Sequence, residues 1–392
     1  MSERTGLVLA GAAARGAYEA GALSVLLPAL EEQGQRPTVL VGTSAGALNA
    51  AFLAYRADRP ADVATKELLD LWLRMGRKDA FAYSPLPALQ MVLNEFGVGG
   101  RPDGLVDTGP LRRTLDGVIC DWGQIQDNVD NGHVDALAVV TTSASTGRTV
   151  VWVAGGTPGG DGGRQLPDLD LKKGIEYRVP IDGIGVEHVL ASAAIPIVFP
   201  PIEVATGTDS TDWFVDGGLR LNTPIKPAIK LGANRIAIVA TDPATHATSV
   251  APLPGHRPDV DDLVLHTLQA VLADPLIEDM WRLAGVNTLL GRNPRDDKTQ
   301  IPYLFVGPSA RGHLGQRAGD VASQLGLSEL RAFGWLLGRQ GAQHEELLSY
   351  FLFDPAFFAT AAELGKQDAQ AELDHQRRKG GKLSWRTKPI TV

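Results

Sequence analysis

Short, wholly apolar runs alternate with small-residue turns and helix-forming segments at the start of the chain. Residues 7–9 and 39–41 are runs of Leu and Val without a polar position, a pattern typical of parallel strands covered on both faces. Each run ends in a turn rich in Gly and Ala, and good helix formers follow at 18–30 and 45–54. The pattern predicts two βα units whose turns lie together at the carboxyl edge of one parallel sheet.

The rest of the chain continues to alternate strand and helix patterns. Strands are predicted at 134–142, 148–153, 213–215, 235–241 and 303–306. Helices are predicted at 64–75, 111–115, 187–194, 260–290, 325–338, 345–351 and 355–365. An aromatic, proline-containing segment at 81–96 is interpreted as core and loop, with a lid or pocket wall as the alternative. We expect an α/β protein, a three-layer α/β/α sandwich with a mainly parallel central sheet.

Composition narrows the functional classes. The 392 residues are 44% hydrophobic and 21% charged, which is ordinary for a globular protein with a sizeable core. The net charge of −8 argues against a nucleic-acid binder, whose phosphate contacts need a basic surface. The single cysteine, Cys120, excludes an intrachain disulfide and a Cys/His metal cluster. No run approaches the ~20 apolar residues that a membrane span requires. We therefore expect a cytoplasmic protein, soluble or peripheral to a membrane, with no metal and no cofactor.

The turn after the second apolar run carries a candidate nucleophile. Gly42, Ser44 and Gly46 have the G-x-S-x-G spacing, in which a serine sits on a tight strand-to-helix turn and small neighbours let strand and helix approach. The hydroxyl would lie at a helix N-terminus, where N–H groups such as that of Ala45 favour developing negative charge. A glycine-flanked serine that only caps an ordinary helix is the alternative, and this motif alone does not decide between them.

The turn after the first apolar run is a candidate anion-binding loop. Such a loop presents successive backbone N–H groups to a phosphate or an oxyanion. A dinucleotide-binding or P-loop motif is excluded, because Ala13 occupies the second glycine position and no Gly-Lys-Ser/Thr follows. A turn with small residues for close packing is the alternative. The loop consists of Gly11, Ala12, Ala13, Ala14, Arg15 and Gly16.

A third candidate follows the predicted strand at 213–215. Asp216, Gly217 and Gly218 would place a carboxylate at a sheet edge, with glycines that admit close backbone approach. A β-turn aspartate is the alternative interpretation. Together, Ser44, Asp216 and the 11–16 loop would supply a nucleophile, a base and oxyanion donors.

A histidine-mediated triad remains an alternative. His133 and His188 precede Asp216, and neither has a catalytic signature. The chain order Ser, Asp, His of α/β-hydrolases would admit a later histidine, although none lies in a convincing strand-end loop. The later histidines are His246, His256, His266, His313, His344 and His375.

These motifs in this order resemble the patatin-like phospholipase family, which has a glycine-rich oxyanion loop ending in Arg/Lys-Gly, then G-x-S-x-G, then Asp-Gly-Gly or Asp-Gly-Ala. The resemblance covers roughly residues 6–370. Further blocks typical of the family lie at 191–196, 199–201 and 222–224. Two more, at 352–355 and 363–365, are typical of its bacterial members.

The resemblance implies a lipid acyl hydrolase with a Ser-Asp dyad. Asp216 would take the proton of Ser44 directly, and Ser44 would attack a fatty acyl ester and form an acyl-enzyme. The 11–16 loop and Ala45 would hold the oxyanion, with Arg15 beside the loop to lend positive potential or to fix its conformation. The expected partner is a lipid or fatty acyl ester.

One departure from the family pattern bears on activity. The family usually has Gly-Gly-Gly where this chain has Gly11, Ala12 and Ala13. An alanine that must adopt a positive φ costs roughly 1–2 kcal/mol or displaces its N–H group. A catalytically weak or silent acyl-lipid-binding protein of the same fold is therefore the alternative function.

The chain is expected to form one acyl hydrolase domain over residues 1–372 and a basic tail over 373–392. The catalytic motifs lie within 6–245, and 246–372 form a C-terminal helical and strand portion. Between 377 and 388 the tail has six basic residues and no acidic one. We expect a solvated, disordered terminus; docking on an anionic membrane, at about 1 kcal/mol per basic residue, is the alternative.

Overall fold

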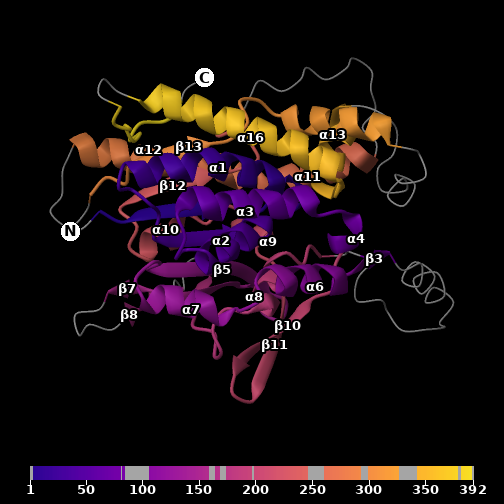
Figure 1. The fold of residues 1–392 in the computed structure, drawn as a ribbon, viewed down its shortest axis with the longest axis horizontal. Helices are drawn as coiled ribbons and strands as arrows, with labels where there is room; N and C mark the ends of the chain where they lie inside the picture. The colour runs from indigo at the N-terminus through magenta and orange to yellow at the C-terminus, as the bar shows by residue number, and fades with distance from the viewer. Residues whose placement is uncertain are drawn as a thin grey trace.

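The computed structural model describes most of the chain (Figure 1). The described residues are 3–80, 82–83, 106–158, 164–167, 174–196, 198–245, 260–292, 299–325, 342–377 and 381–390. Most of the aromatic segment at 81–96, nearly all of the helix predicted at 325–338, and His246 and His256 lie outside them. The interpretation of 81–96 as core and loop, and the alternative of a lid or pocket wall, therefore stay predictions.

A mainly parallel sheet forms the centre of the described structure. Its strands follow the order β10-β11-β5-β2-β1-β12-β13, and β6 and β9 extend it from the other edge of β5. Pairing is parallel among β5, β2, β1, β12 and β13, whereas β6, β10 and β11 introduce antiparallel pairs. The strands are β1 Thr5–Leu9, β2 Val39–Thr43, β5 Ala136–Ser143, β6 Thr149–Gly155, β9 Ile175–Arg178, β10 Ile202–Gly207, β11 Ser210–Asp216, β12 Arg235–Val239 and β13 Tyr303–Val306. Two short ribbons pair β3 Ala82–Tyr83 with β4 Val106–Asp107, and β7 Thr157–Pro158 with β8 Arg164–Gln165.

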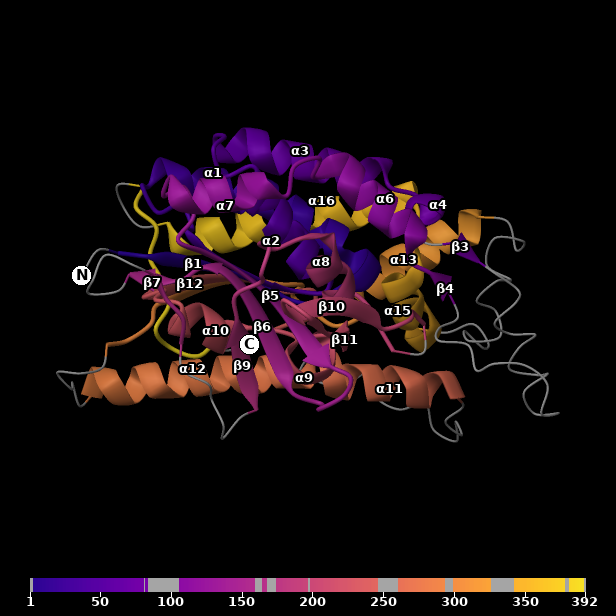
Figure 2. The same cartoon turned by 90° about the horizontal axis from the view of Figure 1, so that it is seen from below.

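Helices cover both faces of this sheet, which makes the three-layer sandwich that the sequence predicts (Figure 2). One layer contains α1 Gly16–Glu32, α2 Ala45–Tyr55, α3 Ala61–Arg74, α6 Gly109–Val118, α7 Gly123–Asp130 and α16 Pro355–Gln376. The other contains α9 Gly218–Leu221, α10 Ile225–Lys230, α11 Val260–Leu272 and α12 Asp274–Arg292. The remaining described helices are η1 Ala13–Arg15, α4 Arg77–Ala80, α8 Val186–Ser192, α13 His313–Gln324 and α15 Ala342–Phe351.

Alternation along the first strand explains why both faces are covered. Leu7 and Leu9 belong to the core under α1 and α2, whereas Val8 belongs to the core under α10 and α12. Successive strand residues point to opposite faces, so an apolar run without polar positions needs a helix layer on each side. The sequence pattern at 7–9 thus sets the three-layer arrangement.

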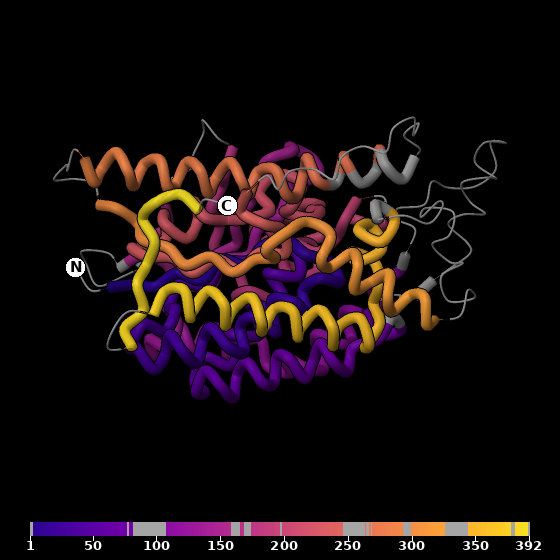
Figure 3. Tube along the Cα trace, turned by 90° about the horizontal axis from the view of Figure 1, so that it is seen from above, coloured from indigo at the N-terminus to yellow at the C-terminus, as the bar shows by residue number. Residues whose placement is uncertain are grey.

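The C-terminal helix packs against the N-terminal one. In Figure 3 the yellow α16 runs beside the indigo α1, and the two helices are in contact along their lengths. A side chain at Gly21 would meet the backbone of Ala362, and one at Gly365 would meet that of Tyr18. Glycine at these two positions lets the helix backbones approach. The first and the last long helix of the chain, α1 and α16, therefore belong to the same hydrophobic core.

The C-terminal tail differs from the expected disorder over residues 381–390. Tyr303 and Arg386 exchange two backbone hydrogen bonds of 2.8 Å. The Arg386 guanidinium binds the Glu372 carboxylate through two contacts of 3.0 and 2.8 Å, and the Trp385 indole donates to Gln35 at 3.0 Å. The basic charge of Arg386 is thus paired within the fold.

Among the described residues, no single helix is long and apolar enough to cross a membrane. α15 and α16 pass that test only as a pair, by length and composition, and they are bent by 103° relative to each other.

Candidate active site

Two strands meet end to end along one edge of β5, and their meeting point is the candidate site. β2 runs parallel to β5 and pairs Thr43 with Val140. β11 comes from the opposite direction and pairs its last residue, Asp216, with Thr141. Because Val140 and Thr141 are neighbours, the residue after β2, Ser44, is brought to the end of β11. The hydroxyl and the carboxylate are thereby placed together although 172 positions separate them in the sequence.

Ser44 occupies a strained elbow between β2 and α2. Its backbone has φ 54° and ψ −125°, a conformation that side-chain-bearing residues rarely adopt and that is typical of a nucleophile elbow. A side chain at Gly42 would collide with the backbone of Gly46, and one at Gly46 would collide with the end of β1. Both glycines of the motif are therefore required by close approach, as predicted.

Ser192 holds the elbow from α8. Its hydroxyl accepts a hydrogen bond from the Ser44 N–H at 2.8 Å and donates one to the Val140 carbonyl at 2.6 Å. Ser192 is fully buried, so this bridge between elbow and sheet is shielded from water. Sequence analysis included it in the block at 191–196 without giving it a role.

Asp216 lies beside Ser44 and is buried from solvent. Its carboxylate accepts a hydrogen bond from the Gly218 N–H at 2.6 Å, and the Ser44 side chain lies near enough to act on its pKa. Burial disfavours the charged form and raises the pKa of Asp216 to about 7, although both of these groups act to lower it. A carboxylate of this pKa is a far better base near neutrality than a free aspartate. Gly217 allows this turn to pass close to the Val140 carbonyl.

The 11–16 loop lies next to the elbow, and several of its N–H groups are already used. Gly11 donates to the Asn222 carbonyl at 3.0 Å, Arg15 to Ala12 at 3.0 Å, and Gly16 to Ala13. Among the described residues of the loop and the start of α2, the N–H groups of Ala12, Ala13, Ala14 and Ala45 have no backbone acceptor. Of the predicted oxyanion donors, Gly11, Arg15 and Gly16 already donate their N–H groups to backbone carbonyls.

Asn222 fastens the loop and was given no role from the sequence beyond its place in the 222–224 block. Its side-chain amide donates to the Gly11 carbonyl at 3.2 Å and to the Leu272 carbonyl at 2.9 Å. Gly11 in turn donates to the Asn222 carbonyl, so the two residues are joined in both directions. Asn222 thus ties the loop to the segment that follows Asp216.

Ala13 is the strained position of the loop. Its φ is 48°, whereas Ala12 has φ −142°. Only Ala13 therefore carries the cost of a side chain at positive φ, roughly 1–2 kcal/mol. Alanine in place of glycine therefore fits the backbone at Ala12 without strain, whereas at Ala13 it strains the backbone.

Replacing Ala13 by glycine is expected to raise the free energy of unfolding by about 1 kcal/mol, because the strain of the positive φ is removed. Ala12→Gly is the matched control and should lower it by about 0.4–1 kcal/mol, since it only adds freedom to the unfolded chain. Urea denaturation of the three proteins measures both changes. Equal losses in the two variants would show that Ala13 is not strained.

Arg15 does not face the candidate nucleophile, which corrects the expected substrate-binding role. Its guanidinium is fully buried, binds Glu346 at 2.6 Å and Ser349 at 2.8 Å, and lies 3.7 Å from the centre of the Tyr350 ring. Asp242 lies 3.8 Å away as a second carboxylate. These contacts support the other expected role, fixing the loop, and they connect it to α15.

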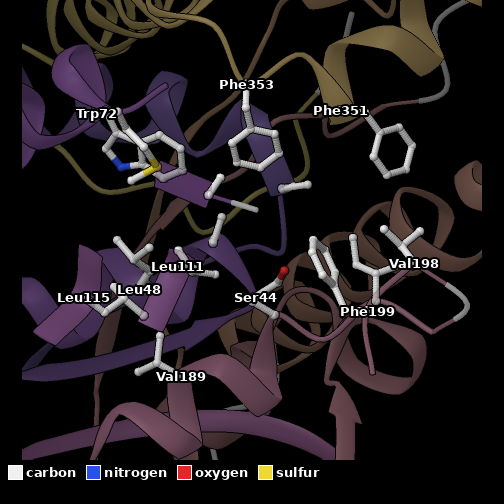
Figure 4. A pocket seen from close by; sticks show the side chains of 16 residues that line it. Ser44, Leu48, Trp72, Leu111, Leu115, Val189, Val198, Phe199, Phe351 and Phe353 are labelled. Carbon is white, nitrogen blue, oxygen red and sulfur yellow. The ribbon is translucent and has the colours of Figure 1, made fainter. Parts of the chain in front are cut away.

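An apolar pocket opens beside Ser44. The Ser44 hydroxyl points into it, and apolar side chains surround it (Figure 4). The loop contributes Ala13, and the elbow contributes Ala45. The lining residues are Ala13, Ser44, Ala45, Leu48, Trp72, Met75, Ala80, Leu111, Leu115, Val189, Ala193, Ile195, Val198, Phe199, Phe351 and Phe353.

The described histidines do not complete a triad. None of them lines the pocket or is among the groups that shift the pKa of Asp216. His188 accepts from the Gly185 N–H at 3.1 Å and packs on Trp152, and burial lowers its pKa to about 4. In the described part of the chain, no three His, Cys, Asp or Glu residues are grouped so as to hold a metal ion.

The fold and this site define an α/β protein with a serine at a nucleophile elbow and a carboxylate beside it, an arrangement suited to nucleophilic acyl chemistry. The family model of the patatin-like phospholipase matches residues 7–229, more than half of the chain. The chain belongs to the patatin-like phospholipase family, a family of lipid acyl hydrolases. Asp242, Glu346 and the pocket residues Phe351 and Phe353 lie beyond the matched range.

No curated protein matches the chain. Among solved structures it is similar to VipD from Legionella pneumophila, with 14% sequence identity and a TM-score of 0.36, over 95% of this chain and 67% of that one. It is also similar to the heterodimeric complex ExoU–SpcU from the type III secretion system of Pseudomonas aeruginosa, with 18% identity and a TM-score of 0.29, over 97% of this chain and 73% of that one.

Proposed function

We propose that the protein hydrolyses acyl esters of lipids with a Ser44–Asp216 dyad. The observation that carries the proposal is the placement of Ser44, at the end of β2, beside the desolvated Asp216 carboxylate, at the end of β11, with an apolar pocket at Ser44. A phospholipase A, a lysophospholipase and a simple esterase share this chemistry.

In the acylation step, Asp216 takes the hydroxyl proton as the Ser44 oxygen bonds to the carbonyl carbon of the ester. The oxyanion that forms accepts hydrogen bonds from the free N–H groups of the loop and of Ala45. The bond from the carbonyl carbon to the alcohol oxygen then breaks, and the alcohol leaves with the proton held by Asp216. An acyl group remains on Ser44.

In the deacylation step, Asp216 takes a proton from water while the water oxygen attacks the acyl carbon. The Ser44 oxygen leaves and regains that proton, so the fatty acid is released and the dyad is restored. The apolar lining favours the acyl chain, since each buried methylene contributes about 0.8 kcal/mol.

The dyad predicts a dependence of activity on pH. Since Asp216 must be ionised to act as a base, and burial raises its pKa to about 7, kcat/KM should fall about tenfold per pH unit below 7 and be constant above it. Initial rates on a soluble short-chain ester between pH 5 and 9 measure this. Recovery of full activity on return to pH 8 excludes unfolding as the cause. A rate that stays constant from pH 5 to pH 8 would contradict the proposed base.

The second candidate function is a silent acyl-lipid-binding protein, and the strained Ala13 in the donor loop favours it. Losing one oxyanion donor costs about 10²–10³ in rate. Release of fatty acid from phospholipid and from p-nitrophenyl esters by the full chain separates the two, with Ser44→Ala as the comparison. Hydrolysis that the substitution removes supports the enzyme, whereas equal background rates support the binding protein.

A further inference from the structure

A second cavity lies behind the wall of the acyl pocket. It is more open to solvent than the acyl pocket and takes its lining from α2, α3, α4, α6 and the residues that adjoin them. Unlike the pocket at Ser44, it has charged residues in its lining. Its charged residues are Arg56, Glu67, Asp70, Arg74 and Asp79.

The two cavities adjoin, because residues close together in the chain line one or the other. On α4, Asp79 lines the second cavity and the next residue, Ala80, lines the acyl pocket. On α6, Val118 lines the second cavity, whereas Leu115 lines the acyl pocket. Met75 lines both, so its side chain fills the place where they adjoin.

Met75 is held at this place by the end of α3. It follows the last residue of that helix, and its N–H donates to the Leu71 and Trp72 carbonyls at 3.0 and 3.2 Å. Its neighbour in the pocket, Trp72, is fixed by a hydrogen bond of 2.8 Å to Asn49. In Figure 4, Trp72 lies on one side of Ser44, and Phe199 and Phe351 lie on the other.

We propose that Met75 is the stop of the acyl pocket and sets the length of acyl chain that the site accepts. The proposal rests on the hydrolysis proposed above and assigns a residue to its specificity. A chain that ends before Met75 is buried along its whole length. A longer chain would have to displace Met75 and enter a cavity lined by charged groups, where its methylenes gain little by burial.

The chain-length profile of ester hydrolysis tests this. In the wild type, kcat/KM on p-nitrophenyl esters from four to sixteen carbons should rise by about fourfold per methylene and then break at a fixed length. Met75→Ala removes three heavy atoms and should move the break two or three carbons longer, a gain of roughly 15- to 60-fold on the long esters. Met75→Trp should move it to shorter chains.

Two controls separate this effect from damage to the fold. The rate on the four-carbon ester should stay within about twofold in Val118→Ala, and every variant should keep a cooperative thermal transition, which shows that the fold is intact. Val118→Ala, which alters only the second cavity, and the volume-conserving Met75→Leu should keep the wild-type break. An unchanged break in Met75→Ala and Met75→Trp, with the short ester still hydrolysed, would overturn the proposal.

If the wild type hydrolyses no ester, the same Met75 variants still test whether Met75 ends the acyl pocket. That result would reject the hydrolytic function, and binding of saturated fatty acids of increasing length would then be measured by displacement of a fluorescent fatty acid. A break in affinity that moves with Met75→Ala and Met75→Trp supports Met75 as the stop. A break at the same length in all variants overturns it.

Discussion

Replacing Ser44 by alanine is expected to lower kcat for ester hydrolysis by about 10⁶-fold, to the background rate. The reason is that the substitution removes the only atom that forms the acyl-enzyme, and loss of the nucleophile of a serine hydrolase typically has this size. Release of fatty acid from a phospholipid and from a short ester measures it. Ser24→Ala is the matched control, because Ser24 only donates to a carbonyl within α1 and should keep full activity.

Thermal unfolding of Ser44→Ala shows whether activity is lost through the missing hydroxyl or through unfolding of the protein. Since alanine inherits the same elbow backbone, the variant should fold and keep a cooperative transition. A folded variant that retains the wild-type rate would remove Ser44 from the reaction.

Replacing Asp216 by asparagine should have the second largest effect, a loss of about 10⁴-fold or more in kcat. Asparagine has nearly the same shape and can still accept from the Gly218 N–H, but it cannot take a proton from Ser44. Initial rates at pH 8 measure the loss. Activity that survives in Asp216→Asn and disappears in a single histidine-to-alanine variant would instead indicate a triad.

Asp216→Asn should also raise the free energy of unfolding, because the buried charge of Asp216 destabilises the folded protein. Burial raises the pKa of Asp216 to about 7, well above that of an unfolded aspartate, so the folded state binds a proton more tightly and stability falls as pH rises from about 4 to 7. Above pH 7 the full cost of the buried charge is present, on the order of 4 kcal/mol. Asparagine avoids it, so the gain should appear at pH 8 and shrink toward pH 5. A stability loss at pH 8 would contradict the raised pKa.

The sequence predicted what short-range patterns determine. The apolar run at 39–41 and the glycines around Ser44 specify a strand, a tight turn and a helix within ten residues, and the structure has all three. The placement of Ser44 beside Asp216 was expected from the family resemblance. Its cause, two strands that meet end to end along β5, depends on antiparallel pairing across the chain, which no local pattern encodes.

Other features were missed for different reasons. The hydrogen-bond partners of Arg15 lie 331 and 334 positions away in the sequence, so the neighbouring residues could not indicate where its side chain points. The predicted helix at 260–290 is two helices, and Asp274-Pro275 at the second start was an available signal, since proline suits the first turn of a helix. α13 was also predictable, because Leu314, Ala318 and Val321 recur at helical spacing.

Covalent labelling by a fluorophosphonate, followed by peptide mapping, tests the dyad most directly, because the reagent reacts with an activated serine and needs no knowledge of the natural lipid. The wild type should carry one adduct, on Ser44, and Asp216→Asn should be labelled at least about 10³-fold more slowly, since its serine has lost the base that activates it. An adduct on a different residue, or equal labelling rates in the two proteins, would contradict a Ser44 nucleophile activated by Asp216.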